Sequence, residues 1–368
     1  MTTFDLLLVG FGHVAQRFIT LLAEQRKTLA REHGVAARVV GITTRSHGQI
    51  HDNRGVDAAS LLRKAAHGKP IGSIPDAHNA ADWIRKAAGT TSAARDARLV
   101  VVETTTLDIL RGQPAIGHVR AGLTSGAHVV TANKGPAAFA YRALAQTATR
   151  AGRRFLFEGA VMDGVPIFNL VRDTLPAVKI LGFRGVVNST TNYILTAMEA
   201  GQPFDEALAE MQKAGIAEAD ASHDVEGWDA AAKTAALANV WLDARLTPHA
   251  VERQGITAAT GARAKAARDS GRRLKLVVSA ARRGDRVNAS VAPEELAPDD
   301  LLAGLEGQQN AILLQTDLLG EIAVVQHGAG LTQTAYALLS DLITIGRDIR
   351  RRPSARRAPA RARRGRNP

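Results

Sequence analysis

The chain has 368 residues, of which 45% are hydrophobic and 22% charged, and it contains no cysteine. This length allows two domains with buried cores, and the lack of cysteine excludes disulfides, thiolate metal sites and cysteine nucleophiles. No apolar run reaches the roughly 18 residues that a spanning helix needs, and the N-terminus enters a strand without the basic segment and cleavage site of a secretory signal. We therefore expect a cytoplasmic enzyme with no membrane contact.

The net charge of +12 is concentrated at one end of the chain. Residues 350–368 carry nine arginines and no acid, and without these nine charges the remainder has a net charge of +3. This segment lacks hydrophobic periodicity, which predicts a disordered, solvated tail. Nonspecific electrostatic contact with nucleic acid is the alternative for the tail, and no nucleic-acid partner is expected for the rest of the chain.

A dinucleotide-binding fingerprint follows the first predicted strand, Phe4–Val9. Gly10, Gly12 and Ala15 fit the G-x-G-x-x-G/A pattern, in which the first glycine allows a tight turn and the second lets the backbone approach a pyrophosphate. The helix beyond offers free N–H groups to the phosphates. The expected cofactor-binding residues here are Gly10, Phe11, Gly12, His13 and Val14.

The second predicted strand, Arg38–Ile42, bears on the choice of cofactor. An acidic residue after this strand would bind the ribose hydroxyls of NAD, but the chain continues Thr43-Thr44-Arg45-Ser46. Arg45 can instead pair with a 2′-phosphate, assisted by the neighbouring hydroxyl groups. This favours NADP(H), with NAD(H) as the alternative and a plain surface arginine as the competing interpretation.

The remaining elements predict the fold class. The next strands, Leu99–Val102 and His128–Val130, are separated by helical stretches, which indicates a parallel doubly wound sheet. The later elements predicted in chain order are strands at Phe155–Phe157 and Val178–Val187, a helix over Phe204–Gln212 closed by Gly215, an Ala-rich helical region to Val240, strands at Leu274–Ala280 and Arg286–Val291 with Pro293 and Pro298 breaking the chain after them, and a glycine turn and helix within Gln326–Ile345.

We thus expect an α/β protein with a Rossmann-type doubly wound parallel sheet and an α+β domain for substrate binding and dimerisation. The predicted boundaries are 1–135 for the NADP-binding domain, completed by 320–349, then 136–319 for the second domain and 350–368 for the tail.

Three polar groups are candidates for chemistry. Asp229 and Lys233 are spaced i,i+4 and can pair on one helix face. Such a pair is commonly a solvated salt bridge. The Ala-rich surroundings of this pair favour burial instead, and a buried charged pair is energetically costly unless it has a function. Lys134 follows a strand at the edge where open α/β sheets bind ligands, with a surface lysine as the alternative. The cluster 188–192 supplies either turn and capping groups or donors to a substrate.

Two histidines near the predicted site are interpreted as ordinary structural residues. We expect His13 to be a polar residue at a helix start and His223 to lie in an exposed loop. Neither belongs to a cluster with metal-ligand spacing.

Several segments together resemble the homoserine dehydrogenase family. The matching blocks are Gly10-Phe-Gly-His-Val14, Thr131-Ala-Asn-Lys-Gly-Pro136, Glu158 to Pro166, Val187 to Leu195, Glu218 to Lys233, Asn310-Ala-Ile312 and Gly328-Ala-Gly330 with the helix after it. They cover residues 4–346 in the family's order. The family's further C-terminal amino-acid-binding domain has no counterpart before the tail, so threonine feedback through such a domain is not expected.

The resemblance implies NADP-dependent interconversion of L-aspartate 4-semialdehyde and L-homoserine in threonine, methionine and isoleucine biosynthesis, by a homodimer. Lys134 and Lys233 match the two lysines at the reacting carbon, and Lys134 also lies near the cofactor. Asp229 matches a further active-site acid. The substrate-binding set implied is Glu218, Asp224, Lys233, Asn188 and Thr190, and the further cofactor contacts are Thr104, Thr105, Lys134 and Gly330.

The resemblance also implies a sodium ion held largely by backbone oxygens of Glu158, Val161, Asp163 and Val165. Asp163 departs from the glycine that is commoner in the family at this position. In the expected mechanism one lysine donates the proton and the other stabilises charge, with Asp229 orienting Lys233. The alternatives are another NADP-dependent oxidoreductase of a small amino-acid-like carbonyl, or a noncatalytic NADP-binding regulator whose tail contacts nucleic acid.

Overall fold

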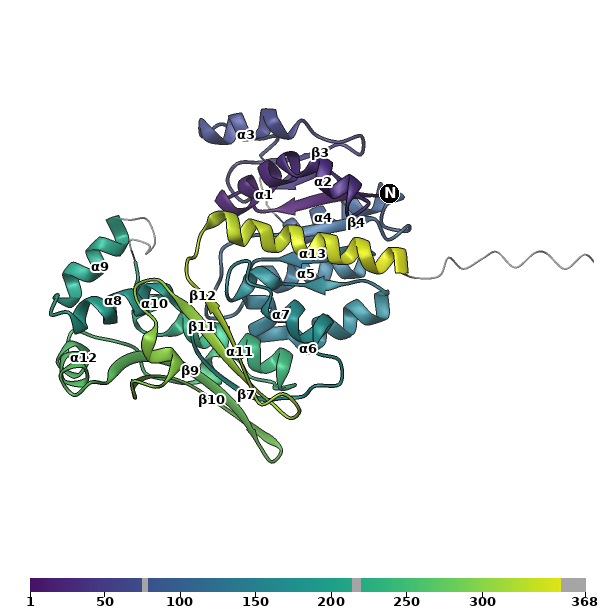
Figure 1. The fold of residues 1–368 in the computed structure, drawn as a ribbon. Helices are drawn as coiled ribbons and strands as arrows, with labels where there is room; N and C mark the ends of the chain where they lie inside the picture. The colour runs from purple at the N-terminus through teal and green to yellow at the C-terminus, as the bar shows by residue number, and fades with distance from the viewer. Residues whose placement is uncertain (75–78, 214–219, 352–368) are drawn as a thin grey trace, which may run out of the picture.

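The computed structural model describes residues 1–74, 79–213 and 220–351 (Figure 1). These residues form two six-stranded sheets with helices packed on them. The first sheet contains β1 (Thr2–Val9), β2 (Val35–Thr43), β3 (Gln49–His51), β4 (Leu99–Glu103), β5 (His128–Thr131) and β6 (Phe155–Leu156). Its helices are α1 (His13–Glu24), α2 (Arg26–Arg31), α3 (Ala58–Ala66), α4 (Ala80–Gly89), α5 (Ala115–Thr124), α6 (Gly135–Ala151) and α13 (Leu331–Arg351).

The first sheet has the order β3-β2-β1-β4-β5-β6. Four of its strand pairings are parallel, whereas β3 pairs antiparallel with β2 at one edge. The Val- and Leu-rich strands are buried on both faces, as expected when helices cover both sides of a parallel sheet. The strand order reverses between β1 and β4, and this reversal opens a crevice at the carboxyl ends of those two strands.

The C-terminal helix α13 returns to the first sheet. Leu338, Leu342 and Ile345 on α13 share a buried cluster with Phe4 and Phe18, and Figure 1 shows α13 lying across this part of the molecule. The helix extends to Arg351, so the first two residues of the predicted tail are helical, and residues 352–368 lie outside the described residues. The chain returns to the first sheet only after β12. The predicted boundary at residue 320 placed this strand in the first domain, but it belongs to the second sheet.

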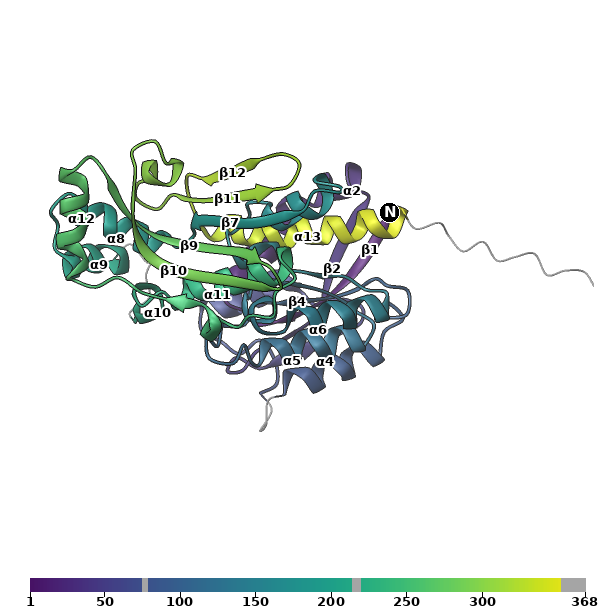
Figure 2. The ribbon, with the colours of Figure 1, turned by 90° about the horizontal axis from the view of Figure 1, so that it is seen from below.

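The second sheet has the order β12-β11-β7-β9-β10-β8, and Figure 2 shows its longer strands side by side. The strands are β7 (Ile180–Val186), β8 (Glu252–Arg253), β9 (Arg273–Arg283), β10 (Arg286–Leu296), β11 (Asn310–Thr316) and β12 (Glu321–Gln326). The accompanying helices are α7 (Ile167–Asn169), α8 (Ser189–Glu199), α9 (Phe204–Lys213), α10 (Ser222–Val225), α11 (Trp228–Trp241) and α12 (Thr260–Asp269). Gly215, predicted to close α9, lies outside the described residues.

Pro293 does not break the chain where the sequence suggested. It lies inside β10, opposite Leu276 of β9. The short strand β8 pairs with β10 only at Ser290 and Val291, so the side of β10 away from β9 is an edge at Pro293. An edge strand tolerates the missing N–H of proline.

Helix α11 links the two halves of the molecule. Its alanines are buried in the larger core cluster, which also contains residues of α5, α6 and the second sheet. The amide of buried Asn239 on α11 donates to the carbonyls of Ala137 and Ala138 on α6. Helices α6 and α11 are therefore held at a fixed mutual position, which matters because each carries a candidate catalytic lysine near its N-terminus. Among the described residues, no helix is long and apolar enough to cross a membrane.

Candidate active site

A pocket of about 750 Å³ lies at the point where the order of the first sheet reverses. Its lining includes Gly10, Phe11, Gly12, His13, Arg45, Thr104 and Thr105 from the predicted cofactor set. Gly10 has φ +93°, and a Cβ there would lie 2.9 Å from the Thr104 carbonyl oxygen, so only glycine fits this turn. Gly12 precedes α1, and a Cβ built on it would have no atom of its surroundings within 4 Å. The turn therefore leaves room for a pyrophosphate beside the N-terminus of α1.

The other predicted cofactor residues lie differently. His13 begins α1, as expected of a polar residue at a helix start. Val14, the second residue of α1, packs against the core and does not line the described pocket. Gly330 also lies outside that lining, just before α13. The start of α13 is tied to α1 by a hydrogen bond from Arg17 Nε to Thr332 Oγ1 (3.0 Å).

The segment after β2 presents Arg45 and Ser46 to the pocket, both exposed. The hydroxyl of Thr44 is used within the turn, where it donates to Gly48 O (3.0 Å) and accepts from His47 N (2.8 Å). Thr44 is therefore not the additional phosphate donor that the sequence suggested. The described lining of the pocket at the end of β2 contains no carboxylate.

Glu103 is a buried carboxylate that the sequence analysis missed. It ends β4 and is completely shielded from solvent. One oxygen accepts from the backbone N–H and hydroxyl of Thr105, and the other accepts from Thr131 Oγ1 (2.8 Å). Nδ1 of buried His118 lies 3.5 Å away. The available signal was an acid at the carboxyl end of the apolar run Leu99–Val102, where open sheets bind ligands.

Glu103 joins the cofactor pocket to the loop that carries Lys134. Thr131 Oγ1 accepts from Asn133 N (2.9 Å), and Asn133 Nδ2 donates to Thr105 O (2.9 Å). Asn133 Oδ1 then accepts from Gly135 N (2.8 Å), which shapes the first turn of α6. The pocket loop and the lysine loop are thus fixed to each other through one buried carboxylate.

We expect Glu103→Gln to lower kcat/KM by about tenfold to a hundredfold, because the amide cannot accept all the hydrogen bonds of the carboxylate and a buried donor is left without a partner. The dinucleotide KM should rise with it, since Thr105 loses its anchor. Steady-state kinetics together with thermal unfolding measure the effect. The control is Glu252→Gln, which replaces an exposed acid on β8. Equal kinetics in the two variants would show that Glu103 does not position the Thr105 and Lys134 loops.

The second part of the site is a cluster of two lysines and two aspartates. Lys134 Nζ lies 3.0 Å from Asp229 Oδ1, and Lys233 Nζ lies 3.1 Å from Asp229 Oδ2. The three side chains are between 14% and 20% exposed, so the pair is not the solvated surface bridge of the competing interpretation. Asp229 therefore holds both lysines, whereas the sequence analysis assigned it to Lys233 alone.

The two ammonium groups differ in what holds them. Lys233 Nζ also donates to the carbonyl of Val187 (2.6 Å), which leaves one of its three N–H groups for a ligand. Lys134 has Asp229 as its hydrogen-bonding side-chain partner among the described residues. Lys134 precedes α6, whose first turn is favoured by Pro136, and Lys233 lies on α11 one turn after Asp229.

Asn188 is both a helix cap and a bridge between the two aspartates. Its Oδ1 accepts from Thr191 N (2.8 Å) at the start of α8. Its Nδ2 donates to Asp224 Oδ1 (2.7 Å) and to Asp229 Oδ2 (2.9 Å). Thr190 lies buried in the first turn of the same helix. The capping alternative for the polar segment 188–192 is thus confirmed for Asn188, and its amide donates to the two aspartates.

The charges of the cluster shift one another. Burial alone would lower the pKa of Lys134, but attraction to Asp229, and less to Asp224, outweighs it and raises the pKa. Burial would raise the pKa of Asp229, yet the two lysines bring it far below its usual range. Burial and repulsion from Asp229 raise the pKa of Asp224. The free site therefore holds Lys134 as an ammonium ion, poised to donate a proton.

Two further predicted residues need separate mention. Glu218, the expected carboxylate for a substrate amino group, lies outside the described residues. His223 is exposed as predicted, but it lies in the short helix α10 and not in a loop.

The predicted metal segment is enclosed by protein contacts. Glu158 accepts from the N–H groups of Phe168 and Asn169 (both 2.8 Å), and burial raises its pKa to about 7. Asp163 has φ +48° and accepts from Gln326 Nε2 (3.0 Å) and Thr334 Oγ1 (2.9 Å). Val161 is buried, and the Val165 carbonyl accepts from Ile167 N (2.8 Å). Across the described residues, no group of three or more His, Asp or Glu side chains could hold a metal ion.

A glycine turn at the strand-order reversal, joined through Thr105 and Asn133 to a mostly buried lysine pair, defines an oxidoreductase with a dinucleotide-binding domain. Comparison with known families supports this class. The model of the family "Homoserine dehydrogenase, NAD binding domain" matches residues 10–158, and that of the family "Homoserine dehydrogenase" matches residues 166–343. The chain belongs to the homoserine dehydrogenase family.

Individual relatives cover nearly the whole chain. An NAD(+)-dependent homoserine dehydrogenase of Pseudomonas canavaninivorans is 38% identical over 96% of this chain and 99% of its own length. A homoserine dehydrogenase of Methanocaldococcus jannaschii is 35% identical over 93% and 98%, respectively. The crystal structure of a homoserine dehydrogenase from Thiobacillus denitrificans superposes with a TM-score of 0.77 at 30% identity, covering 97% of this chain and 76% of that one.

Proposed function

We propose that this protein interconverts L-homoserine and L-aspartate 4-semialdehyde with a nicotinamide dinucleotide. The observation that carries the proposal is the mostly buried pair Lys134 and Lys233, which share Asp229. This pair is joined to the dinucleotide pocket through the hydrogen bond from Asn133 to Thr105 O. Residues 1–135 with α13 would bind the dinucleotide, and the segment from residue 136 to β12 the substrate. Matching names among relatives of similar length support the assignment.

When bound, the reduced nicotinamide supplies a hydride to the aldehyde carbon, and the oxidised form accepts one in reverse. The carbonyl oxygen then gains negative charge and needs a proton. Lys134, tied to Asp229 by its ammonium group, donates that proton. Lys233, fixed by Asp229 and the Val187 carbonyl, directs its remaining N–H at the oxygen and stabilises its charge. In the oxidative direction Lys134 acts as the base, so its neutral form is needed and the rate rises with pH.

The substrate's own charges fit the rest of the cluster. Asp224 of α10 and the Asn188 amide at the start of α8 both lie at Asp229, which holds the lysines. We propose that Asp224, Asn188 and Thr190 contact the amino-acid end of the substrate, together with Glu218. With the amino-acid end of homoserine held there, its hydroxyl carbon would lie between the lysines and the nicotinamide.

We propose NADP(H) as the preferred cofactor, because exposed Arg45 and Ser46 line the pocket at the end of β2. The relative from Pseudomonas canavaninivorans is described as NAD(+)-dependent, so this point needs its own test. Arg45→Ala should raise KM for NADP by about tenfold to a hundredfold, the range for a lost charge-assisted bond, and leave KM for NAD unchanged. Arg26→Ala on α2 is the control; equal losses with both cofactors would show that Arg45 does not read the phosphate.

We propose that a sodium ion is held by main-chain oxygens between Glu158 and Val165. The carboxylates of Glu158 and Asp163 already accept hydrogen bonds from the protein, which leaves backbone carbonyls as the donors. Replacing sodium with tetramethylammonium in the assay and in thermal unfolding tests this proposal. A fall in melting temperature supports it, and identical curves contradict it.

We propose that the protein is a homodimer joined through the outer face of the second sheet. Leu181 and Val325 alternate with the core-facing residues Ile180 and Val324, so they point away from the core, and they are 49% and 37% exposed. Such apolar side chains on an antiparallel face fit a self-complementary interface. Light scattering should give twice the chain mass, and Leu181→Glu should reduce it; a monomeric mass for the unaltered protein contradicts the proposal.

A further inference from the structure

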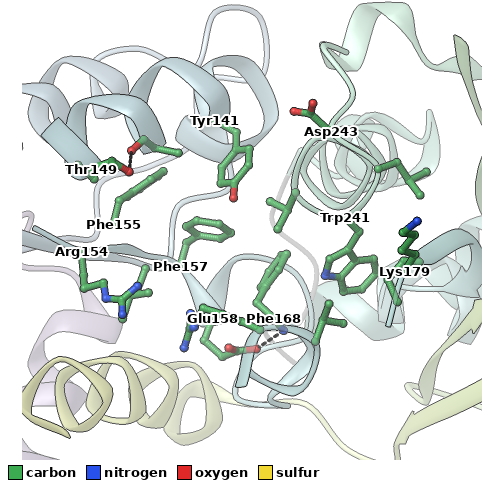
Figure 3. Close-up of a pocket in the computed structure, with 18 of the residues that line it drawn as sticks. Tyr141, Thr149, Arg154, Phe155, Phe157, Glu158, Phe168, Lys179, Trp241 and Asp243 are labelled. Atoms are coloured by element: carbon green, nitrogen blue, oxygen red, sulfur yellow. Dashed lines mark hydrogen bonds between the residues drawn. The ribbon is translucent and has the colours of Figure 1, made fainter. Parts of the chain in front are cut away.

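A second cavity lies at the far ends of the two helices that carry the catalytic lysines. Its volume is about 640 Å³, within the range of small-molecule sites, and it is bounded by α6, β6, the start of β7 and the end of α11. Figure 3 shows its aromatic wall, with Arg154 on one side and Lys179 on the other. Asp229 lies in the first turn of α11 and Trp241 ends the helix, which separates the two sites by about 18 Å along the helix.

The wall of this cavity is a continuous row of aromatic rings. Tyr141 and Phe157 have centroids 5.7 Å apart, Phe157 and Phe168 4.9 Å, and Phe168 and Trp241 5.7 Å. Their planes meet at 80°, 72° and 48°, so the rings present both edges and faces. Such a wall suits a planar apolar group.

Most basic groups at the cavity already have partners within the protein, and the guanidinium of Arg154, for example, pairs with Asp348 (2.7 Å). Two donor atoms do not. The Trp241 Nε1 and Arg154 Nε atoms are buried and have no hydrogen-bond partner among the described residues. Lys179 lies exposed at the rim. In all, five basic and two acidic side chains line the described cavity. A buried donor without a partner is costly, so an acceptor that fills the cavity is favoured.

Helix α6 offers a route from this cavity to the catalytic cluster. Ala140 has non-helical angles (φ −141°, ψ 16°), which kinks α6 between Lys134 and Tyr141. Asn239 of α11 donates to the carbonyls of Ala137 and Ala138, which a regular helix would pair with the N–H groups of Tyr141 and Arg142. The part of α6 after the kink lines the cavity, and the part before it begins at Lys134.

We propose that this cavity is a regulatory site for a small carboxylate with an aromatic body, and that its occupation shifts α6 against α11. The carboxylate binds Lys179 and the Trp241 donor on one side of the cavity, and the ring packs on Phe157 and Phe168 (Figure 3). Because Lys134 and Asp229 lie on the two helices, their 3.0 Å contact changes with the angle between them. Binding at the cavity and binding at the active site are then coupled in both directions.

Isothermal titration calorimetry with phenylacetate tests the site on the intact protein. We expect one site per chain with a Kd on the order of 1 mM, as for a fragment of this size. Phenylacetamide, which lacks the charge, and acetate, which lacks the ring, should each bind at least about tenfold more weakly. Lys179→Gln and Trp241→Phe should weaken phenylacetate by about three- to tenfold, whereas the exposed control Lys27→Gln should not.

Absence of binding at about ten times that concentration, or equal affinity in all variants, would overturn the site. Hydrogen exchange tests the coupling independently of catalysis. Saturating phenylacetate should change exchange of backbone amides in residues 135–151, and it should change kcat for homoserine oxidation. Binding that leaves both exchange in α6 and kcat unaltered would overturn the coupling.

Discussion

Replacing Lys233 with alanine is expected to lower kcat by about 10² to 10⁴, the range for general acid–base and charge-stabilising groups. The ammonium group is fixed by Asp229 (3.1 Å) and by the Val187 carbonyl (2.6 Å). These two contacts also fix the direction in which its third N–H points. Alanine removes both the charge and that donor. Initial rates of homoserine oxidation at saturating substrate measure the loss, and circular dichroism checks that the variant is folded.

Lys265→Ala provides the matched control, since this lysine is exposed on α12. Lys134→Ala should lose a similar factor, and the double variant should lose less than the product of the two, because the lysines act on one oxygen. A folded Lys233→Ala protein with the kcat of the unaltered protein would contradict the assignment.

The second large effect concerns Asp229, which holds both lysines. Asp229→Asn keeps the shape of the side chain but removes the charge that raises the pKa of Lys134. The pKa of Lys134 should therefore fall, and the alkaline rise of kcat/KM for oxidation should move to lower pH. At the same time kcat should fall by about 10² or more, because the lysines lose their common anchor. The measurement is the pH profile of kcat/KM from neutral to alkaline pH.

Asp224→Asn is the graded comparison for this prediction. Asp224 also attracts Lys134, but less than Asp229 does, so its removal should shift the profile in the same direction by a smaller amount. A profile that moves to higher pH in Asp229→Asn, or one that moves further in Asp224→Asn, would refute the proposed charge arrangement.

The parts of the site that depend on neighbouring residues could be predicted from sequence. The fingerprint at Gly10 and Gly12 describes one turn between a strand and a helix, so its consequences are local. The Asp229–Lys233 pair follows from the pitch of a single helix. The doubly wound sheet follows from alternating strands and helices, apart from the antiparallel edge strand β3.

The parts that depend on packing between distant segments could not. Lys134 reaches Asp229 only because α6 packs against α11, and no local pattern encodes that crossing. The role of Glu103 depends on its hydrogen bonds with Thr105 and Thr131, and the bond with Thr131 joins segments that are distant in the sequence. Thr44 seemed a phosphate donor because its use within the turn is invisible in the sequence.

The most direct test of the proposed function is the initial rate of L-homoserine oxidation by the purified protein at alkaline pH, with NADP and with NAD, followed by the absorbance of the reduced nicotinamide. We predict turnover with both, favouring NADP, and its loss in Lys233→Ala. Turnover favouring NAD would support the proposed activity and contradict the proposed selection of NADP by Arg45. No turnover with either cofactor, from a folded protein that binds the dinucleotide, would contradict the proposed function.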